Sequence, residues 1–243
     1  MTSYSLNLED LLLYRDAMIL VLNKPKGYAV HKGKGRKPNL EDYFYQLQFG
    51  LPTVPGLGHR LDASTSGCLV LGRHAKALRR LGILFSGGQI KKTYWAIVRG
   101  HLPQSQGIID LPLAKINDRK SSWWMKVDPQ GQKAVTEYRV LGEIEGYSFV
   151  ELSPITGRTH QLRVHLDALG CPIVGDPVYG RSVPDLDDDN LHLLARSIEI
   201  PLSAKKEPIR VVAPVPPHML DLLSQFKDIE EIKVSFDELK CES

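Results

Sequence analysis

The stretch from Gly58 to Gly72 reads Gly-His-Arg-Leu-Asp-Ala-Ser-Thr-Ser-Gly-Cys-Leu-Val-Leu-Gly, and the interpretation of the whole chain starts from it. Its second half, from Cys68 to Leu71, is a short apolar run between glycines, which predicts a strand buried on both faces. Its first half is a loop rich in Ser, Thr and Gly that carries Arg60 and Asp62. A carboxylate beside a buried strand is well placed to act as a catalytic group. Asp62 could equally be a turn-forming residue with Arg60 as its surface partner.

Length and composition indicate a soluble globular protein. The chain has 243 residues, of which 42% are hydrophobic and 24% charged, enough to bury a sizeable core. No apolar run approaches the length of a membrane span, and no basic and apolar segments mark a secretory signal. The three cysteines are widely spaced, which argues against a disulfide framework or a zinc site. We therefore expect a cytoplasmic protein that binds neither a membrane nor a metal.

Charge is distributed unevenly along the chain. Residues 1–180 carry 23 Lys and Arg against 15 Asp and Glu, whereas residues 181–243 carry 8 against 13. A basic body fits a polyanion on one face, although uneven surfaces are common. The stretch from Lys24 to Lys37, which includes Lys26 and Lys34, holds six Lys and Arg and no acid. It is either a loop that contacts a phosphate backbone or a solvated loop.

Periodicity and turn residues predict the other elements. Strands are expected at 17–22, 68–71, 91–100, 134–141, 147–152, 191–202 and 209–213. Helices are expected at 39–47, 74–85, 159–170 and 216–226, the third with Thr159 as its N-cap. The first 16 residues are expected to form a short helix or irregular backbone. Many short strands with few helices predict an α+β fold on a mixed, largely antiparallel sheet.

Two further segments carry polar residues of interest. Lys92 and Tyr94 lie in the strand expected at 91–100, where a tyrosine usually packs against neighbours. The run Gly157-Arg158-Thr159-His160-Gln161-Leu162-Arg163 leads into the third helix, where Arg163 could pair with Asp167 one turn later. His160 has no neighbours with metal-ligand spacing, so we predict no zinc site here.

These segments together resemble the RluA-type family of RNA pseudouridine synthases. The matching motifs are His59-Arg60-Leu61-Asp62 with Thr65-Ser66-Gly67, Lys92-x-Tyr94, and Gly157 to His165, after an Asn-Lys-Pro turn that begins at Asn23. The resemblance runs from about Asn23 to about Pro217, with three motifs in the family's order. It implies the pseudouridine synthase fold, a mixed sheet split by a central catalytic cleft with flanking helices.

The resemblance also implies an activity, an isomerase that converts uridines of RNA to pseudouridine after base flipping, without a cofactor. Asp62 would be the catalytic carboxylate, Arg163 its ion-pair partner and Tyr94 the residue against the target base. Arg60 would fill the gap that the flipped base leaves. The residues expected to bind RNA are Arg60, His59, Lys24, Lys26, Lys34, Lys92, Arg158 and His160.

We expect one catalytic domain over residues 1–226, with two subdomains around the cleft and no separate N-terminal RNA-binding domain, followed by a charged tail over 227–243. The protein is expected to act as a monomer on stem-loops of transfer or ribosomal RNA, where unstacked bases are accessible. One alternative is a catalytically silent RNA-binding protein of the same fold. Another is a glycoside-type hydrolase, which needs two carboxylates, with Asp167 and Asp176 as the acids near the motifs.

Overall fold

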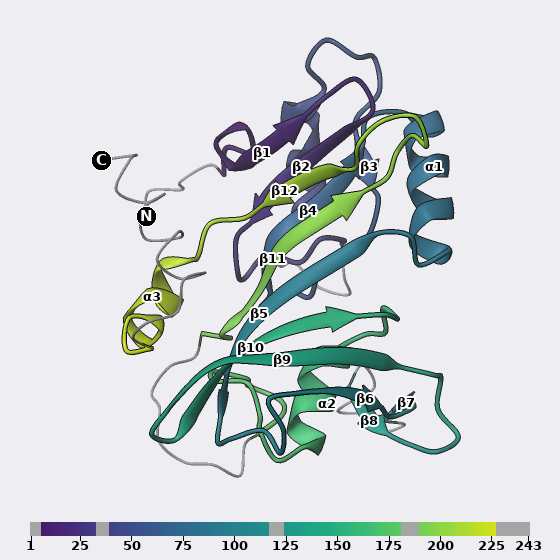
Figure 1. Ribbon diagram of the computed structural model, residues 1–243. Coiled ribbons are helices and arrows are strands. Elements are labelled where there is room, and N and C mark those ends of the chain that lie inside the picture. The colour runs from purple at the N-terminus through teal and green to yellow at the C-terminus, as the bar shows by residue number, and fades with distance from the viewer. Residues whose placement is uncertain (1–5, 33–38, 117–123, 181–189, 227–243) are drawn as a thin grey trace. The chain divides into compact units, whose positions relative to one another are not determined.

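The computed structural model describes residues 6–32, 39–116, 124–180 and 190–226 (Figure 1). The chain divides into two compact units: unit 1 is Met1–Lys91 with Ala195–Ala213, and unit 2 is Lys92–Leu194 with Pro214–Ser243. Lys34 and the predicted tail at 227–243 lie outside the described residues. Within the described ranges, no helix is both long and apolar enough to cross a membrane.

Unit 1 is built around a fully buried strand. Its elements are the 3₁₀ helices η1 (Glu9–Leu11) and η2 (Glu41–Leu47), the strands β1 (Leu12–Arg15), β2 (Ile19–Lys24), β3 (Gly56–Leu57), β4 (Ser66–Gly72), most of β11 (Leu193–Ile200) and β12 (Ile209–Val212), and the helix α1 (Ala75–Ser86). The strand order is β1-β2-β4-β11-β12, with β3 paired to the end of β4. Every residue of β4 is buried, as its apolar sequence predicts. β2 runs antiparallel to β4 and brings Lys24 opposite Gly67.

Helix α1 approaches β3 and β4 closely because glycines face it. The helix begins after His74, whose Nδ1 accepts a hydrogen bond from a backbone N–H of the first turn. A Cβ placed on Gly72 would lie 2.7 Å from a side-chain carbon of Leu78, and one on Gly58 would lie 2.8 Å from Leu81. A side chain at Gly72 would therefore push the helix away from β4, because its Cβ would lie only 3.0 Å from the backbone nitrogen of Leu78.

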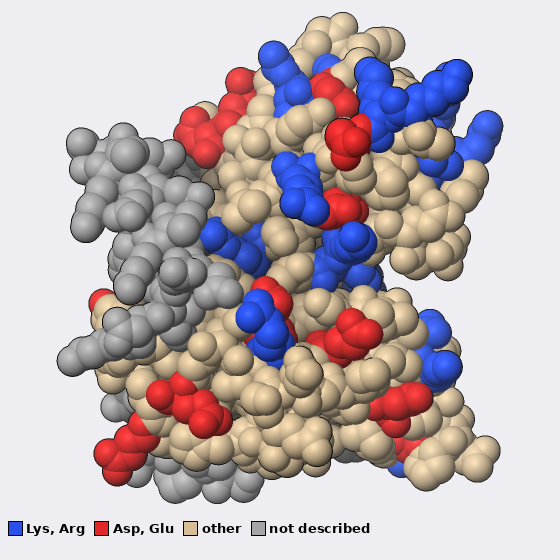
Figure 2. All heavy atoms as spheres, in the orientation of Figure 1, with Lys and Arg blue, Asp and Glu red and all other residues tan. Residues whose placement is uncertain are grey.

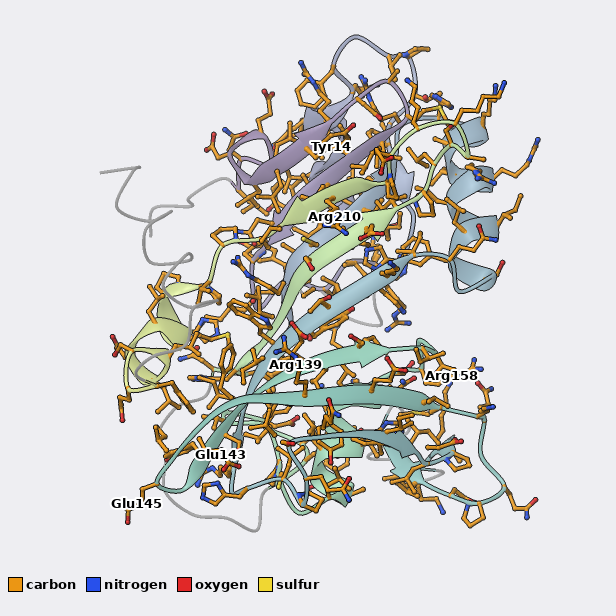
Figure 3. The ribbon with its side chains drawn as sticks, in the orientation of Figure 1. Tyr14, Arg139, Glu143, Glu145, Arg158 and Arg210 are labelled. Atoms are coloured by element: carbon orange, nitrogen blue, oxygen red, sulfur yellow. The ribbon has the colours of Figure 1, made fainter. Side chains whose placement is uncertain are left out.

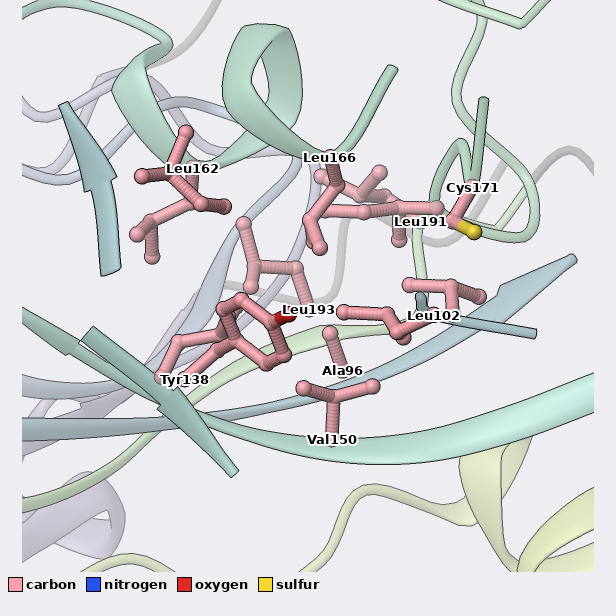
Figure 4. Close-up of a cluster of buried hydrophobic side chains, with 13 residues drawn as sticks. Ala96, Leu102, Tyr138, Val150, Leu162, Leu166, Cys171, Leu191 and Leu193 are labelled. Atoms are coloured by element: carbon pink, nitrogen blue, oxygen red, sulfur yellow. The ribbon is translucent and has the colours of Figure 1, made fainter. Parts of the chain in front are cut away.

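Unit 2 is a second antiparallel arrangement covered by a short helix. Its elements are β5 (Lys91–Arg99), β6 (Gln106–Asp110), β7 (Leu113–Lys115), β8 (Met125–Val127), β9 (Val135–Ile144), β10 (Tyr147–Pro154), α2 (Gln161–Ala168) and α3 (Pro217–Leu223). The order is β5-β10-β9-β6, and β7 pairs separately with β8. Leu162 and Leu166 of α2 pack in one buried cluster with Ala96, Tyr138 and Val150 of the strands (Figure 4). This cluster fixes α2 on the sheet.

The predicted α+β class with a largely antiparallel sheet is confirmed, and the predicted hairpins are β9–β10 and β11–β12. The short helix predicted in the first 16 residues is present as η1, but residues 12–15 form the strand β1, which was not predicted. Asp16 causes this by turning the chain: its Oδ1 accepts the N–H groups of Met18 and Ile19, both at 2.7 Å. The turn folds β1 back antiparallel onto β2.

Candidate active site

Asp62 lies on the loop that joins β3 to β4 in unit 1. The start of the loop is fastened to β4, because the Gly58 N–H donates to the Val70 carbonyl at 2.9 Å. Leu61 is buried, whereas Arg60 is exposed and Asp62 is half-buried. A turn follows, closed by the Thr65 N–H donating to the Asp62 carbonyl at 3.1 Å. The loop thus anchors itself through Leu61 and leaves the Asp62 carboxylate partly accessible.

The position of Lys24 differs from the prediction that it contacts RNA. Its side chain is fully buried, and its Nζ donates to the carbonyls of Pro25 at 2.8 Å, Ala63 at 3.0 Å and Thr65 at 2.8 Å. Three acceptors match the three donors of an ammonium group. The prediction that Lys24 contacts RNA is therefore wrong, because this amine is used to hold the residues that flank Asp62.

Burial changes the acid–base behaviour of Lys24. It lowers the pKa of Lys24 to about 7, and the nearby Asp62 carboxylate opposes that shift by favouring the charged form. The Gly27 N–H also donates to the Ala63 carbonyl at 2.8 Å. The turn after β2 thus fastens the far end of the Asp62 loop through a lysine and through its own backbone.

His59 also has a role inside the fold that the sequence did not reveal. Its Nε2 accepts the Val70 N–H at 3.0 Å, so the neutral ring carries its proton on Nδ1. The ring stacks on Phe85 of α1, with 4.8 Å between the ring centroids. His59 therefore continues the β3–β4 pairing with a side-chain acceptor, and its contact with RNA stays a prediction.

Several other basic residues of unit 1 lie at its surface. Lys26 is exposed, on the turn that follows the buried Lys24. Figure 2 shows Lys and Arg side chains gathered over α1, which carries Lys76, Arg79 and Arg80 and no acidic residue. Of these, Arg80 donates from Nε to the Leu202 carbonyl at 3.1 Å. The prediction that Lys26 binds RNA is compatible with its exposure.

Tyr94 lies on β5 in unit 2, opposite Leu152 of β10. Its side chain is half-buried and packs against the cluster beneath α2. Lys92, two residues earlier, is also half-buried, and burial lowers its pKa below the ordinary lysine value. A Cβ on Gly157 would lie 3.9 Å from the Lys92 Nζ. The second and third sequence motifs therefore meet within unit 2.

The start of α2 differs from the prediction. The helix begins at Gln161, and its N-cap is His160 in the left-handed region at φ 53°, with no side-chain cap, so Thr159 is not the cap. The Gln161 side chain bonds the residues that precede the helix. Its Oε1 accepts the Arg158 N–H at 3.0 Å and the Thr156 hydroxyl at 2.7 Å, and its Nε2 donates to the Val135 carbonyl at 3.0 Å. Gln161 thereby ties the loop before α2 to β9.

Arg163 is buried on α2 and forms a two-point ion pair. Its Nε and Nη2 donate to Oδ2 and Oδ1 of Asp176, both at 2.7 Å, and the side chains are 3% and 1% exposed. The local pairing with Asp167 that helical spacing suggested is replaced by this longer-range pair. Burial and the nearby Asp176 charge raise the pKa of Asp167 instead. The pairing of Arg163 with Asp62 stays a prediction.

The two remaining predicted RNA-binding residues differ in exposure. His160 is buried, and its Nδ1 lies 2.9 Å from the Tyr179 hydroxyl within unit 2, and its contact with RNA stays a prediction. Arg158 is exposed and lies beyond β10, at the end of the hairpin opposite the Glu145 turn (Figure 3). Its Nε donates to the Lys133 carbonyl at 3.0 Å. RNA contact by Arg158 stays a prediction.

Together, the described residues offer acid–base groups and no metal cage. Unit 1 presents one half-buried carboxylate, Asp62, on a fixed loop. Unit 2 presents the Tyr94 phenol and the buried Arg163 guanidinium. In the parts of the chain that the structure describes, no group of three His, Cys, Asp or Glu could hold a metal ion. Such a set suits covalent or proton-transfer chemistry on a substrate.

Solved structures define the fold class. The chain is similar to human RNA pseudouridylate synthase domain containing 4, with a TM-score of 0.74 and 30% identity over 90% of this chain and 94% of that one. It is also similar to human RNA pseudouridylate synthase domain containing 1, with a TM-score of 0.68 and 30% identity over 87% and 85% of the two chains. The fold is that of the pseudouridine synthases.

Sequence comparison then gives the family. The family model described as RNA pseudouridylate synthase matches residues 18–168. An uncharacterized RNA pseudouridine synthase of Zymomonas mobilis is 46% identical over 86% of this chain and 95% of its own length. Ribosomal large subunit pseudouridine synthase D of Borreliella burgdorferi is 33% identical over 96% of this chain and 73% of its own length. The chain belongs to the RNA pseudouridylate synthase family, of the RluA type.

Proposed function

We propose that this protein isomerises specific uridines of structured RNA to pseudouridine, with Asp62 as the catalytic carboxylate. The observation that carries the proposal is the Asp62 loop, where a half-buried carboxylate stands on a backbone fastened at both ends. A rigid loop on a packed strand is a favourable support for a catalytic group. The loop also carries the motif that resembles the active-site motif of the family.

The reaction needs no oxidant, reductant or added group. The bond between ribose C1′ and uracil N1 breaks, the base turns, and a new bond forms between C1′ and C5. The proton on C5 leaves and N1 gains one, so the product has the composition of the substrate. In the proposal Asp62 either bonds to the sugar or removes a proton from it. Tyr94 lies against the base and takes part in the last proton transfer.

Arg163 has an electrostatic role in the proposed site. Ionisation of a carboxylate becomes less favourable as the carboxylate loses contact with water, and a nearby guanidinium restores the charged form. Arg163 is a buried guanidinium in the third motif. We propose that it keeps Asp62 ionised during the reaction.

RNA recognition follows from the need to reach a stacked base. Extruding a uridine costs a few kcal/mol, and the exposed Arg60, two residues before Asp62, would fill the gap. Lys26, Lys34, Lys92 and Arg158 would contact the RNA backbone. We propose ribosomal or transfer RNA stem-loops as substrates, ribosomal RNA being supported by the names of several relatives. We also propose that the protein acts in the cytoplasm as a monomer.

The test is product analysis after incubation with unmodified transcripts of transfer and ribosomal RNA. Nuclease digestion and chromatography of the nucleosides should show pseudouridine appearing as uridine disappears in equal amount. RNA binding without pseudouridine would overturn the proposal in favour of a silent RNA-binding protein. Release of free uracil would overturn it in favour of a hydrolase.

A further inference from the structure

The sequence gives Asp176 no role other than that of an acid near the third motif, yet Asp176 is one of the most constrained carboxylates that the structure describes. Its two oxygens accept from Nη2 and Nε of Arg163, both at 2.7 Å. Oδ1 also accepts the N–H groups of Val178 at 2.9 Å and Tyr179 at 3.0 Å. These two backbone bonds hold the carboxylate in place independently of Arg163.

The guanidinium is held from a second direction by Tyr179. The Arg163 Cζ lies 5.1 Å from the centre of the Tyr179 ring, a cation–π distance. The Tyr179 hydroxyl accepts the Met125 N–H at 2.9 Å and lies 2.9 Å from Nδ1 of His160. The ring is therefore fixed between β8 and the residue that precedes α2.

We propose that Asp176 is a positioning residue for the isomerisation, which holds Arg163 in the one orientation that serves Asp62. This inference rests on the proposed function. Asp176 takes the edge of the guanidinium formed by Nε and Nη2, so in the proposed function the edge that carries Nη1 would serve the Asp62 carboxylate. Hydrogen bonds from Val178 and Tyr179 stop Asp176 from following Arg163 if that side chain turns.

A buried guanidinium such as that of Arg163 needs a carboxylate partner. An arginine that is 3% exposed would leave a buried charge uncompensated without a carboxylate. The planar fork of arginine also has a fixed geometry that a lysine cannot reproduce. A displacement of about 1 Å in a catalytic site costs on the order of 10²-fold in rate. Asp176 therefore controls the reaction through the place of Arg163, without touching the uridine.

The first experiment measures single-turnover rates and RNA affinity on a transcript in which the wild-type protein forms pseudouridine. Asp176→Asn should lower the rate by about 10²-fold and change the RNA dissociation constant by no more than a few-fold. Arg163→Lys should lose a similar factor because the fork is absent. Asp167→Asn is the matched control, because it removes a carboxylate from the face of α2 that carries Arg163. It should keep the wild-type rate. Rates within threefold of wild type for Asp176→Asn or Arg163→Lys would overturn the proposal.

The second experiment does not depend on activity. In ¹⁵N-labelled protein the Arg163 Nε–H should give a slowly exchanging resonance, assigned by its absence in Arg163→Lys. The resonance should persist in Asp167→Asn and be lost in Asp176→Asn, and its persistence in Asp176→Asn would overturn the proposal. Asp176→Asn hardly changes the size of the side chain. The thermal unfolding midpoint of each variant is measured first, and each assay is run below that midpoint. If Asp176→Asn fails to fold, Arg163→Lys decides the rate test. If the wild-type protein forms no pseudouridine, that result overturns the proposed function and leaves the resonance test of Asp176 to be judged separately.

Discussion

The Asp62 loop of unit 1 and the Arg163 side chain of unit 2 are held by different means. The loop is fixed through its backbone, since Lys24 and Gly27 bind the carbonyls that follow Asp62. Arg163 is fixed through its side chain, by one buried carboxylate and one aromatic ring. The backbone support of the loop is shared among several hydrogen bonds to carbonyl groups. The side-chain support of Arg163 depends mainly on one ion pair, with an aromatic ring beside it.

The largest expected effect comes from breaking the side-chain support. Arg163→Met should lower the free energy of unfolding by about 3–5 kcal/mol, because Asp176 is left charged and buried. Adding Asp176→Asn should recover part of that loss, since both partners are then neutral. Urea unfolding measures both values, with the exposed Arg158→Met as the control, expected within about 0.5 kcal/mol of wild type. A double variant as unstable as Arg163→Met would contradict a coupled pair.

Breaking the backbone support should cost somewhat less. Lys24→Met leaves three carbonyls without the ammonium, so we expect the free energy of unfolding to fall by about 2–3 kcal/mol. RNA affinity should stay within a few-fold, because the side chain is fully buried. Lys26→Met, on the other side of Pro25, is the matched control for stability and should shift it by less than about 0.5 kcal/mol. Equal stability of the two variants would remove Lys24 from its supporting role.

A third prediction concerns pH and the helix that carries Arg163. The His165 Nε2 donates to the Leu111 carbonyl at 3.0 Å, and its Nδ1 lies 3.0 Å from the Thr136 hydroxyl. Burial is the main cause that lowers the pKa of His165 below the ordinary 6.5. The unfolded chain therefore binds this proton more readily than the folded one. The contribution of His165 to stability is full above pH 6.5 and is lost as the pH falls toward the lowered pKa.

Urea unfolding between pH 5 and pH 8 tests this directly. The wild-type protein should lose stability as the pH falls through this window. His165→Gln removes the titrating group and should show a shallower dependence, whatever its absolute stability. Parallel curves for the two proteins would assign the pH dependence to other groups.

The smallest expected effect falls on RNA binding at the surface of unit 1. Lys26→Ala should weaken binding by a few-fold and reduce the slope of log affinity against log salt by about 1. Lys205→Ala, an exposed lysine between β11 and β12, is the control and should leave the slope unchanged. Filter binding at several salt concentrations measures both. An unchanged slope for Lys26→Ala would mean that this turn is merely solvated.

Much of the fold could be predicted because local pattern and burial agree. The apolar run before Gly72 is a buried strand, and the apolar spacing after His74 is a helix. The start of α2 could not be predicted, since His160 takes a left-handed conformation that accompanies its contact with Tyr179. The capping preference of Thr159 is a local property and carries no information about that tertiary contact.

The motif residues of the candidate site could be proposed from the sequence, whereas the contacts that support them could not. Lys24 begins the stretch 24–37, which holds six Lys and Arg and suggests a solvated or RNA-binding loop. The pairing of β2 with β4 nevertheless buries the Lys24 side chain. Helical spacing offered Asp167 as the partner of Arg163, while the loop after α2 supplies Asp176. In both cases the deciding contact joins segments whose proximity depends on the folded sheet.

The proposed role of Asp62 is tested by the rate of pseudouridine formation by Asp62→Asn under single-turnover conditions. We expect a loss of about 10³-fold or more, with RNA affinity within a few-fold of wild type, because the proposed carboxylate acts in the chemical step. Asp221→Asn, an exposed acid on α3, should retain the wild-type rate. A rate for Asp62→Asn within tenfold of wild type would contradict the central claim that this carboxylate performs the reaction.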